Sequence, residues 1–501
     1  MAIRVYNTLS HQKEPFEPVS PGRVGIYLCG PTVYKPSHIG HAVGPIVFDV
    51  IKRFLTYRGY SVRLVVNITD VDDKLIDEAA AQGTTVPELA ERMTGNYLDA
   101  MKRLGIDTID EMPKASEHIG EIVGMIQKLI GGGQAYAAGG DVYFDVSTDA
   151  DYGKLSNRRV EDQQSVRDLE GGGKRNAGDF ALWKAAKSHE PVEVRYDSPW
   201  GPGRPGWHIE CSAMSMKYMG DTLDMHGGGL DLIFPHHENE IAQSESATGK
   251  PFAKYWLHNG LTRFNTKKVS KSDSEMAEAL KKMILTHLLD THGGELLRYF
   301  VLSTHYRRPI EFSDVELESK RKGLVQFHRL FERIERVCGR SLFDVAGDGF
   351  STWRAADKGG HGAFADEVAG HLTQFEESMD DDFNTAAAIA AMFECTTRVN
   401  RFIEENKLES GGGDASSKAV LLAAGGALMG YGRLLGLFRS RPEAASCDGD
   451  GVVDELMDIL IATRAEARKV KQFGIADLIR VRLGEAGITL EDRADGTVWR
   501  R

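Results

Sequence analysis

The segment IFPHHENEIAQ, from Ile233 to Gln243, concentrates side chains that can bind a metal ion. Pro235 suits the first turn of a helix, where its missing N–H group leaves no hydrogen bond unmade. On that helix His236 and Glu240 lie four residues apart and share one face. An imidazole and a carboxylate on one face are half of a metal site, which needs further ligands from elsewhere. The same spacing also fits a buried histidine beside a solvated helix face, so both interpretations stay open at this point.

Two further motifs carry side chains that are suited to binding phosphate. In PSHIGHA, His38 and His41 lie where a helix is expected to begin, and Gly40 lets a ligand approach the backbone closely. Imidazole donors at that position could stabilise negative charge that develops on a phosphate. In KKVSKS, Lys268 and Lys271 could reach phosphates as point charges. Taken singly, the histidines are also explained by helix capping and packing, and the lysine motif is better explained as a solvated surface loop.

The elements around these motifs predict a parallel α/β sheet. The apolar runs at 23–30 and 60–69 are typical of buried strands, and a segment with helical periodicity that ends at Gly59 lies between them. A second helix is expected over 87–104. This alternation of strand and helix is typical of a parallel sheet, in which a nucleotide binds at the carboxyl ends of the strands.

Changes in composition divide the chain into further modules. Glycine-punctuated strands follow a helix expected over 116–130, and the chain reads as almost wholly helical from about residue 315. The segment 461–501 has nine Lys/Arg against six Asp/Glu. We expect a Rossmann-like α/β domain with an insertion, then an all-α domain and a small C-terminal module. The predicted boundaries are 1–115 and 201–315 for the two halves of the α/β domain, 116–200 for the insertion, 316–445 for the helical domain and 450–501 for the module.

The bulk composition narrows the class of protein. With 501 residues, 42% hydrophobic and 27% charged, the chain has the composition of a soluble globular protein. A net charge of −12 argues against a general nucleic-acid coat, although a local basic patch could still bind RNA. Five scattered cysteines do not suit a disulfide scaffold, and we expect a reducing, cytoplasmic location. We find no signal peptide or membrane-spanning run, so no membrane partner is expected.

Together the motifs resemble those of one enzyme family. His-Ile-Gly-His after the first strand and Lys-Val-Ser-Lys-Ser after the last resemble the two ATP-binding signatures of class I aminoacyl-tRNA synthetases. YLCGPTVY, NITDVDDKL, DFALWK, GWHIECSAM, FPHHENEIAQ and DDFNTAAAI follow in order along the chain. The whole set resembles the cysteinyl-tRNA synthetases over nearly the entire sequence. Val269 departs from the pattern, because the family usually has methionine there.

The resemblance implies a complete metal site. It places one zinc ion per chain on four side chains, Cys29, Cys211, His236 and Glu240. Thiolate, imidazole and carboxylate are all ligands that Zn²⁺ accepts. Cysteine and serine have nearly the same shape, so a pocket alone separates them poorly, whereas a soft metal binds thiolate much better than alcohol. The neighbouring His237 and Glu238 are expected to support or pack against the site.

The resemblance also implies a reaction and its substrates. The chain would activate L-cysteine with ATP and Mg²⁺ and transfer it to tRNA(Cys), working as a monomer. Thr69 and Trp207 resemble residues that line the cysteine pocket, and Asp231 resembles one that holds either the ribose of ATP or the substrate amine. Catalytic roles fall to His38, His41, Lys268 and Lys271, and ATP binding to Gly40, His41, Asp231, Lys268 and Lys271.

Two other functions stay open. A cysteine ligase of the mycothiol pathway resembles this catalytic core, but it attaches cysteine to an amino sugar and lacks an anticodon-binding region. The long region after residue 315 favours the synthetase. A catalytically inactive paralogue that binds RNA is the second alternative. All the expected ATP-contacting residues are present, which disfavours it.

Overall fold

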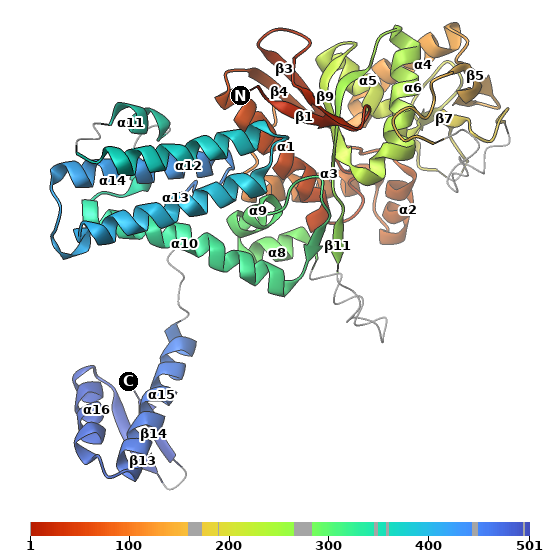
Figure 1. Ribbon diagram of the computed structural model, residues 1–501. Helices are drawn as coiled ribbons and strands as arrows, with labels where there is room; N and C mark the ends of the chain where they lie inside the picture. Colours follow the sequence, from red (N-terminus) through yellow and green to blue (C-terminus); the bar gives the residue numbers. More distant parts are fainter. Residues whose placement is uncertain are drawn as a thin grey trace. The chain divides into compact units, whose positions relative to one another are not determined.

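The computed structural model describes residues 2–158, 173–188, 190–264, 283–344, 349–356, 360–442, 449–493 and 496–500. This part of the chain forms two compact units, 1–439 and 440–501 (Figure 1). Each unit is described by itself. Among the described residues, no helix has both the length and the apolar character that crossing a membrane requires.

A four-stranded parallel sheet carries the sequence motifs, in the order β10-β9-β3-β4. The strands are β3 (Arg23–Leu28), β4 (Ser61–Val66), β9 (Leu223–Gly229) and β10 (Ala253–Asn259). The two predicted strands are therefore confirmed, with each ending slightly earlier than expected. The chain proceeds from β3 to one neighbour, β4, and returns much later to the other neighbour, β9. The switch in strand order lies between β3 and β9, where ligands bind in such sheets.

Helices cover both faces of the sheet. Neighbouring residues of a strand point to opposite faces, so each strand contributes side chains to two hydrophobic cores. Ile26 and Leu28 of β3 share a hydrophobic core with α1 (Ile39–Tyr57), which connects β3 to β4. Tyr27, between them, shares a different core with Met214 of α5 (Trp207–Met219). The nearly continuous apolar sequence of the strands follows from this two-sided burial.

Two helices follow β4, and the sequence predicted the second of them. These are α2 (Asp73–Gln82) and α3 (Val86–Arg103), the second of which was expected over 87–104. Thr85 and Glu88 form a capping box at the start of α3, which satisfies backbone N–H groups that the first turn leaves unpaired. The apolar side chains of α3 fall on one buried face, Leu89, Met93, Tyr97 and Ala100 among them.

The insertion has an antiparallel sheet of its own and a hydrophobic core that also includes Ile209 and Ala213 of α5. A short turn, η1 (Ala115–His118), leads into α4 (Ile119–Gly131), which packs against that core. Its sheet has the order β5-β6-β7-β8. The strands are β5 (Ala135–Ala138), β6 (Asp141–Phe144), β7 (Phe180–Ala185) and β8 (Gly203–Pro205), with the short turns η2 (Val146–Thr148) and η4 (Val192–Val194) between strands.

The metal-ligand segment is helical from Pro235 onward, as expected. Phe234 is extended, at φ −139° and ψ 132°, because a residue before proline is disfavoured in the helical region. From Pro235 the chain forms the wide, π-helical turn of η6 (Ile233–His237), which continues directly into α6 (Glu238–Thr248). A 3₁₀ turn, η5 (Leu230–Leu232), precedes it. His236 and Glu240 therefore lie on one helical segment, four residues apart.

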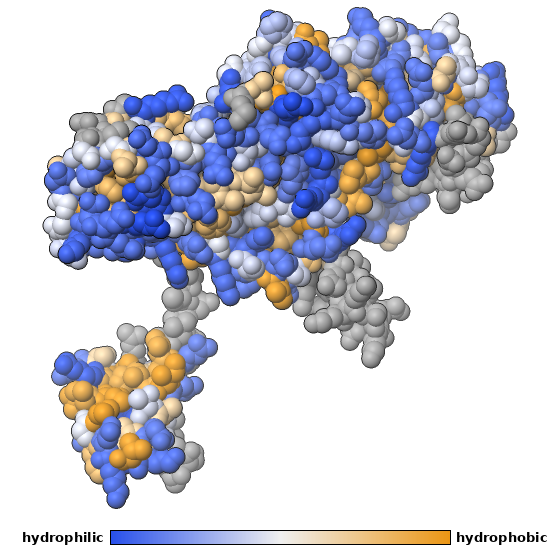
Figure 2. Space-filling view, viewed as in Figure 1, coloured by the Kyte–Doolittle hydropathy of each residue, from blue (hydrophilic) through white to orange (hydrophobic). Residues whose placement is uncertain are grey.

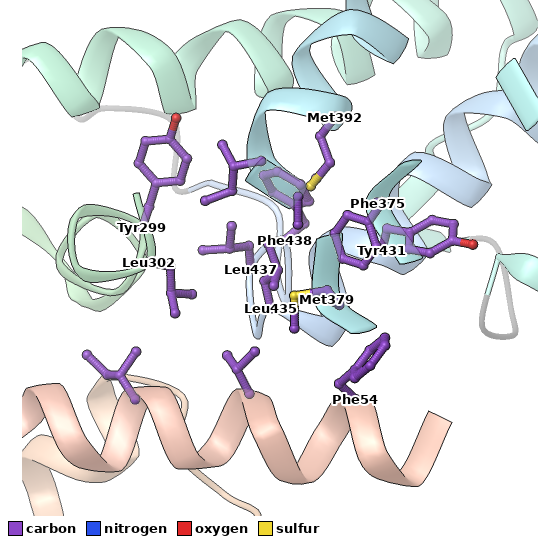
Figure 3. Packing of buried hydrophobic residues seen from close by; sticks show 14 of the residues in the cluster. Phe54, Tyr299, Leu302, Phe375, Met379, Met392, Tyr431, Leu435, Leu437 and Phe438 are labelled. Carbon is purple, nitrogen blue, oxygen red and sulfur yellow. The ribbon is translucent and has the colours of Figure 1, made fainter. Parts of the chain in front are cut away.

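The remaining elements of the first unit are mostly helical and share one core with the catalytic sheet. In Figure 3, Phe54 of α1 faces Tyr431 and Met379, and Leu435, Leu437 and Phe438 lie in the middle of this core. The helices are α8 (Leu285–His292), α9 (Gly294–Leu302), α10 (Asp314–Cys338), α11 (Phe350–Ala355), α12 (Gly362–Asp380), α13 (Thr385–Glu405) and α14 (Ala415–Leu434), with the turns η8 (Leu342–Asp344) and η9 (Leu408–Ser410). Two small sheets complete the unit, β1 (Arg4–Asn7) with β2 (Gln12–Pro15) and β11 (Thr262–Phe264) with β12 (Ile310–Phe312).

The second unit contains two helices and a β-hairpin, α15 (Gly449–Lys469), α16 (Phe473–Glu485), β13 (Thr489–Arg493) and β14 (Gly496–Arg500). Met457, Leu483 and Leu490 form its small core. Large apolar side chains also remain on its surface, as Figure 2 shows for the visible face, and they include Leu456, Ile459, Phe473, Leu478 and Val481.

Candidate active site

Four predicted ligands come together although they are far apart in sequence. Cys29 follows β3, Cys211 lies on α5, His236 lies in η6, and Glu240 lies in the first turn of α6. One ligand atom from each lies within 4.8 Å of the others. The Sγ of Cys29 is 3.8 Å from the Sγ of Cys211, 3.6 Å from Nε2 of His236 and 3.5 Å from Oε1 of Glu240. Nε2 of His236 lies 3.0 Å from the same carboxylate oxygen.

The backbone around Cys29 places its thiol at the switch point of the sheet. The N–H group of Cys29 donates to the carbonyl of Gly227, at the end of β9, over 3.0 Å. On the other side, the N–H group of Gly30 donates to Oδ1 of Asn67. A β-carbon at Gly30 would come 1.7 Å from the Asn67 carbonyl oxygen, so only glycine permits this close approach. The strand ends thus converge on the thiol.

The electrostatics of the cluster favour a bound cation. Burial alone would raise the pKa of the Glu240 carboxyl, but the imidazoles of His226 and His236 outweigh it and hold that pKa well below its ordinary value. A hydrogen bond with Cys29 lowers the pKa of the Cys211 thiol to about 6, against the effect of burial. A carboxylate and a thiolate are therefore present near neutral pH. Two sulfurs, an imidazole and a carboxylate at these separations fit Zn²⁺.

Three further histidines lie near this cluster. The sequence analysis did not single out His226 or His258, and it expected His237 only to support or pack against the site. His226, on β9, contacts the other oxygen of Glu240, Nε2 to Oε2, over 2.8 Å. His237 contacts His258 over 2.8 Å, and His258 contacts the hydroxyl of Thr8 over the same distance. Cys29, His226, His237 and Glu240 form a second group with metal-binding geometry. The only signal in the sequence was that His226 lies near the carboxyl end of a strand.

Glu238 holds part of the insertion in place. Its carboxylate accepts the backbone N–H groups of Gly153, Leu155 and Ser156, over 3.1, 3.3 and 2.8 Å. Because Glu238 begins α6, the loop 153–156 is tied to the helix that carries Glu240. Glu238 thus supports the helix that carries Glu240, which is the kind of role that the sequence suggested for it.

Two side chains were predicted for the cysteine pocket, Trp207 and Thr69. Trp207 lies beside the cluster, and Thr69 contacts α5, the helix that carries Cys211. The ring of Trp207 stacks on that of His236, with centroids 4.1 Å apart. Thr69 is buried and donates its hydroxyl to Oε2 of Glu210 over 3.2 Å. Glu210, one residue before Cys211, was not singled out from the sequence. Asp231 lies on η5, directly after β9 at the same edge of the sheet, with its side chain exposed.

His38 and His41 are joined in a capping box at the start of α1. Their rings stack with centroids 3.8 Å apart. Nδ1 of His38 accepts the N–H of Gly40 over 3.1 Å, and Nδ1 of His41 accepts the N–H of His38 over 3.3 Å. Burial, with smaller contributions from His38 and Lys74, lowers the pKa of His41 to about 4, so this ring is neutral near pH 7. A neutral ring that accepts at Nδ1 carries its proton on Nε2, which can donate to a phosphate oxygen.

The second motif that was predicted to bind ATP lies outside the described residues, and with it Lys268, Val269 and Lys271. The chain on its C-terminal side is described and meets the first motif. The N–H of Leu285 donates to the carbonyl of Ser37 over 2.7 Å, and Ile284 forms a β-bridge with His38. Ile284 and Leu285, which follow the lysine motif in the sequence, therefore lie at the start of α1.

Comparisons with known proteins identify the class first. A family model, tRNA synthetases class I (C) catalytic domain, matches residues 15–322. The fold is similar to Mycobacterium tuberculosis methionyl-tRNA synthetase in complex with methionyl-adenylate, with a TM-score of 0.57 and 14% identity, covering 82% of this chain and 89% of that one. It is similar to a putative arginyl-tRNA synthetase from Campylobacter jejuni, with a TM-score of 0.56 and 13% identity over 84% and 94%. The catalytic unit has the fold of the class I aminoacyl-tRNA synthetases.

The particular family follows from closer relatives. Two further family models match the C-terminal part, the DALR domain over 374–439 and the cysteinyl-tRNA ligase anticodon binding domain over 450–500. The chain is 46% identical to a cysteine–tRNA ligase from Geobacter sulfurreducens, over 100% of both chains. It is 42% identical to one from Thermococcus gammatolerans, over 100% of this chain and 99% of the relative. The chain belongs to the cysteine–tRNA ligase family, which confirms the resemblance seen in its motifs.

Proposed function

We propose that the chain activates L-cysteine with ATP and transfers the cysteinyl group to tRNA(Cys). The observation that carries this proposal is the cluster of Cys29, Cys211, His236 and Glu240 at the switch point of the sheet. The cluster offers a place for a thiol-binding metal at the edge where a nucleotide binds. Membership of the cysteine–tRNA ligase family supports the same reaction.

One zinc ion per chain is the proposed cofactor, held by these four side chains. Such an ion supplies a soft Lewis acid that binds a thiolate strongly and an alcohol weakly, which separates cysteine from serine. The stacked ring of Trp207 limits the space beside His236. Cys29 is partly exposed, so a substrate can approach the cluster from solvent. Thr69 and Trp207 are the residues we assign to the cysteine pocket.

The adenylation step needs positioning and charge stabilisation rather than a side-chain nucleophile. The carboxylate oxygen of cysteine attacks the α-phosphorus of ATP, the bond to the β-phosphate oxygen breaks, and pyrophosphate leaves. His38 and His41 would donate hydrogen bonds to the phosphates at the start of α1, and Lys268 and Lys271 would add positive charge. Mg²⁺ accompanies ATP. Asp231 would hold the ribose of ATP or the substrate amine at the carboxyl end of β9.

The transfer step brings in tRNA. A hydroxyl of the terminal ribose attacks the carbonyl carbon of the adenylate, and AMP leaves with the bonding electrons. We assign tRNA binding to the helical region 316–445 and to the module 450–501, and adenylation to the catalytic halves 1–115 and 201–315 around the insertion 116–200. We further propose that the enzyme works as a monomer in the cytoplasm, without a membrane partner.

Two assays on the purified protein test this proposal together. Cysteine-dependent exchange of pyrophosphate into ATP reports adenylation, and charging of total tRNA with labelled cysteine reports transfer. We expect both activities, and serine should not replace cysteine in either. Exchange without charging would contradict the tRNA step and favour the amino-sugar ligase. Absence of both activities in folded, zinc-loaded protein would favour the inactive RNA-binding paralogue.

A further inference from the structure

An unpaired hydroxyl lies beside the first ATP-binding motif. Oγ1 of Thr262 is buried and has no hydrogen-bond partner among the described residues. Thr262 begins β11, directly after β10, and pairs with Ile310 of β12 through the backbone. Buried hydroxyl groups in proteins are normally paired, so one that is not calls for an explanation.

The position of this hydroxyl suggests what its partner is. A β-carbon added at Gly40 would lie 3.8 Å from Oγ1 of Thr262 and 2.9 Å from Nδ1 of His38. The hydroxyl of Thr262 therefore lies beside Gly40 and the ring of His38 at the first turn of α1. It also lies just beyond the carboxyl end of β10, at the edge where nucleotides bind in parallel sheets.

We propose that Thr262 is an ATP-binding residue whose hydroxyl hydrogen-bonds to ATP bound over Gly40. This inference rests on the proposed function, which brings ATP to the His38–His41 motif. A threonine hydroxyl can both donate and accept, and ATP offers ring nitrogens, ribose hydroxyls and phosphate oxygens as partners. Binding of ATP would then satisfy a polar group that the free protein leaves unpaired.

The substitution Thr262→Val tests this directly, because it replaces the hydroxyl with a methyl group of similar size. In cysteine-dependent pyrophosphate exchange we expect the KM for ATP to rise about 2- to 10-fold, the usual effect of losing one neutral hydrogen bond. The KM for cysteine should stay unchanged, and Thr262→Ser should restore the KM for ATP. The free Thr262→Val protein should melt no earlier than the wild type, since it loses no hydrogen bond.

Thr396→Val is the matched control. Thr396 is a buried threonine whose hydroxyl, like that of Thr262, has no hydrogen-bond partner among the described residues, but it lies on α13 in the helical region. Its substitution should leave the KM for ATP unchanged. An unchanged KM for ATP in Thr262→Val, or a lowered melting temperature of that variant, would overturn the inference.

Equilibrium dialysis with ATP alone separates this inference from the proposed function. Weaker ATP binding by Thr262→Val would support the role of Thr262 even in a protein that shows no exchange with cysteine. Equal binding by wild type and variant would overturn it even if cysteine activation is demonstrated.

Discussion

At the scale of single residues, the cluster joins groups whose charges depend on one another. Glu240 contacts His236 through one oxygen and His226 through the other, so its carboxylate is held ionised although it is fully buried. The carboxylate, with Cys211, raises the pKa of His236 to about 10, against the lowering effect of burial. In the absence of a metal, His236 thus carries the positive charge of the site. A zinc ion would replace that proton, because a metal ligand must bind through a neutral imidazole.

The ligand assignment predicts which cysteine controls metal content. Cys211→Ser should lose zinc and cysteine activation, because an alcohol is a poor zinc ligand compared with a thiolate. Cys338→Ser is the control, since Cys338 lies on α10, outside the cluster. Elemental analysis after dialysis without chelators should find about one zinc per chain in the wild type and the control. Equal zinc in both variants would show that Cys211 is not a ligand.

At the scale of elements, α1 must be held firmly because its first turn carries His38 and His41. Pro45 lies inside α1 and cannot donate the backbone hydrogen bond that would tie that turn to the next. The rest of α1 is anchored by the buried Asp49, which forms an ion pair with Arg298 of α9. Arg298 also donates from Nε to the carbonyl of Leu435, after α14, over 2.6 Å. One guanidinium thus connects the signature helix to the end of the helical bundle.

This buried pair predicts a large cost when only one partner is removed. Asp49→Leu leaves the Arg298 guanidinium buried without its carboxylate, and the free energy of unfolding should fall by about 3–5 kcal/mol. The double variant Asp49→Leu/Arg298→Met should recover most of that loss, because no unpaired charge remains. Unfolding in urea, followed by circular dichroism, measures both values.

An exposed ion pair provides the comparison. Lys250 and Asp221 lie 2.7 Å apart on the surface, and Asp221→Ala should cost no more than about 1 kcal/mol. If Asp49→Leu cost as little as Asp221→Ala, the buried pair would not be what anchors α1.

At the scale of the whole molecule, the described residues that we propose for adenylation and the C-terminal module belong to separate compact units. The cluster and the His38–His41 motif lie within 1–439, whereas 440–501 has its own core around Met457. Within that unit the segment 461–501 is net basic, and Arg468 and Arg480 are among its exposed cations. Such a module can bind RNA without taking part in adenylation.

Truncation after Arg439 tests this division of labour. Pyrophosphate exchange should continue, because the unit 1–439 keeps its core and all proposed adenylation residues. Affinity for tRNA should fall about tenfold or more, with a shallower dependence on salt, since phosphate contacts are lost. Filter binding at several salt concentrations, on protein shown to be folded by circular dichroism, measures this. Unchanged tRNA affinity would mean that residues 440–501 serve another purpose.

Much of this protein could be derived from its sequence, because the relevant signals are local. The apolar runs at 23–30 and 60–69 with a periodic helix between them identify a parallel sheet, since each pattern is set by burial along a single element. The motifs around His38 and His236 were sufficient to recognise the family. The chemistry of thiol, imidazole and carboxylate side chains then suggested zinc, although the role of each ligand stays a prediction.

Other features were decided only by tertiary structure. The contacts of Glu240 with His226 and of Thr69 with Glu210 join different elements, and no periodicity encodes which residues of two elements meet. The same holds for Thr262, whose hydroxyl is notable only because β11 passes beside Gly40. The wide turn from Pro235 to His237, ahead of the regular helix α6, was likewise not expected from the sequence. Sequence patterns show which face of an element is buried, whereas packing decides what that face touches.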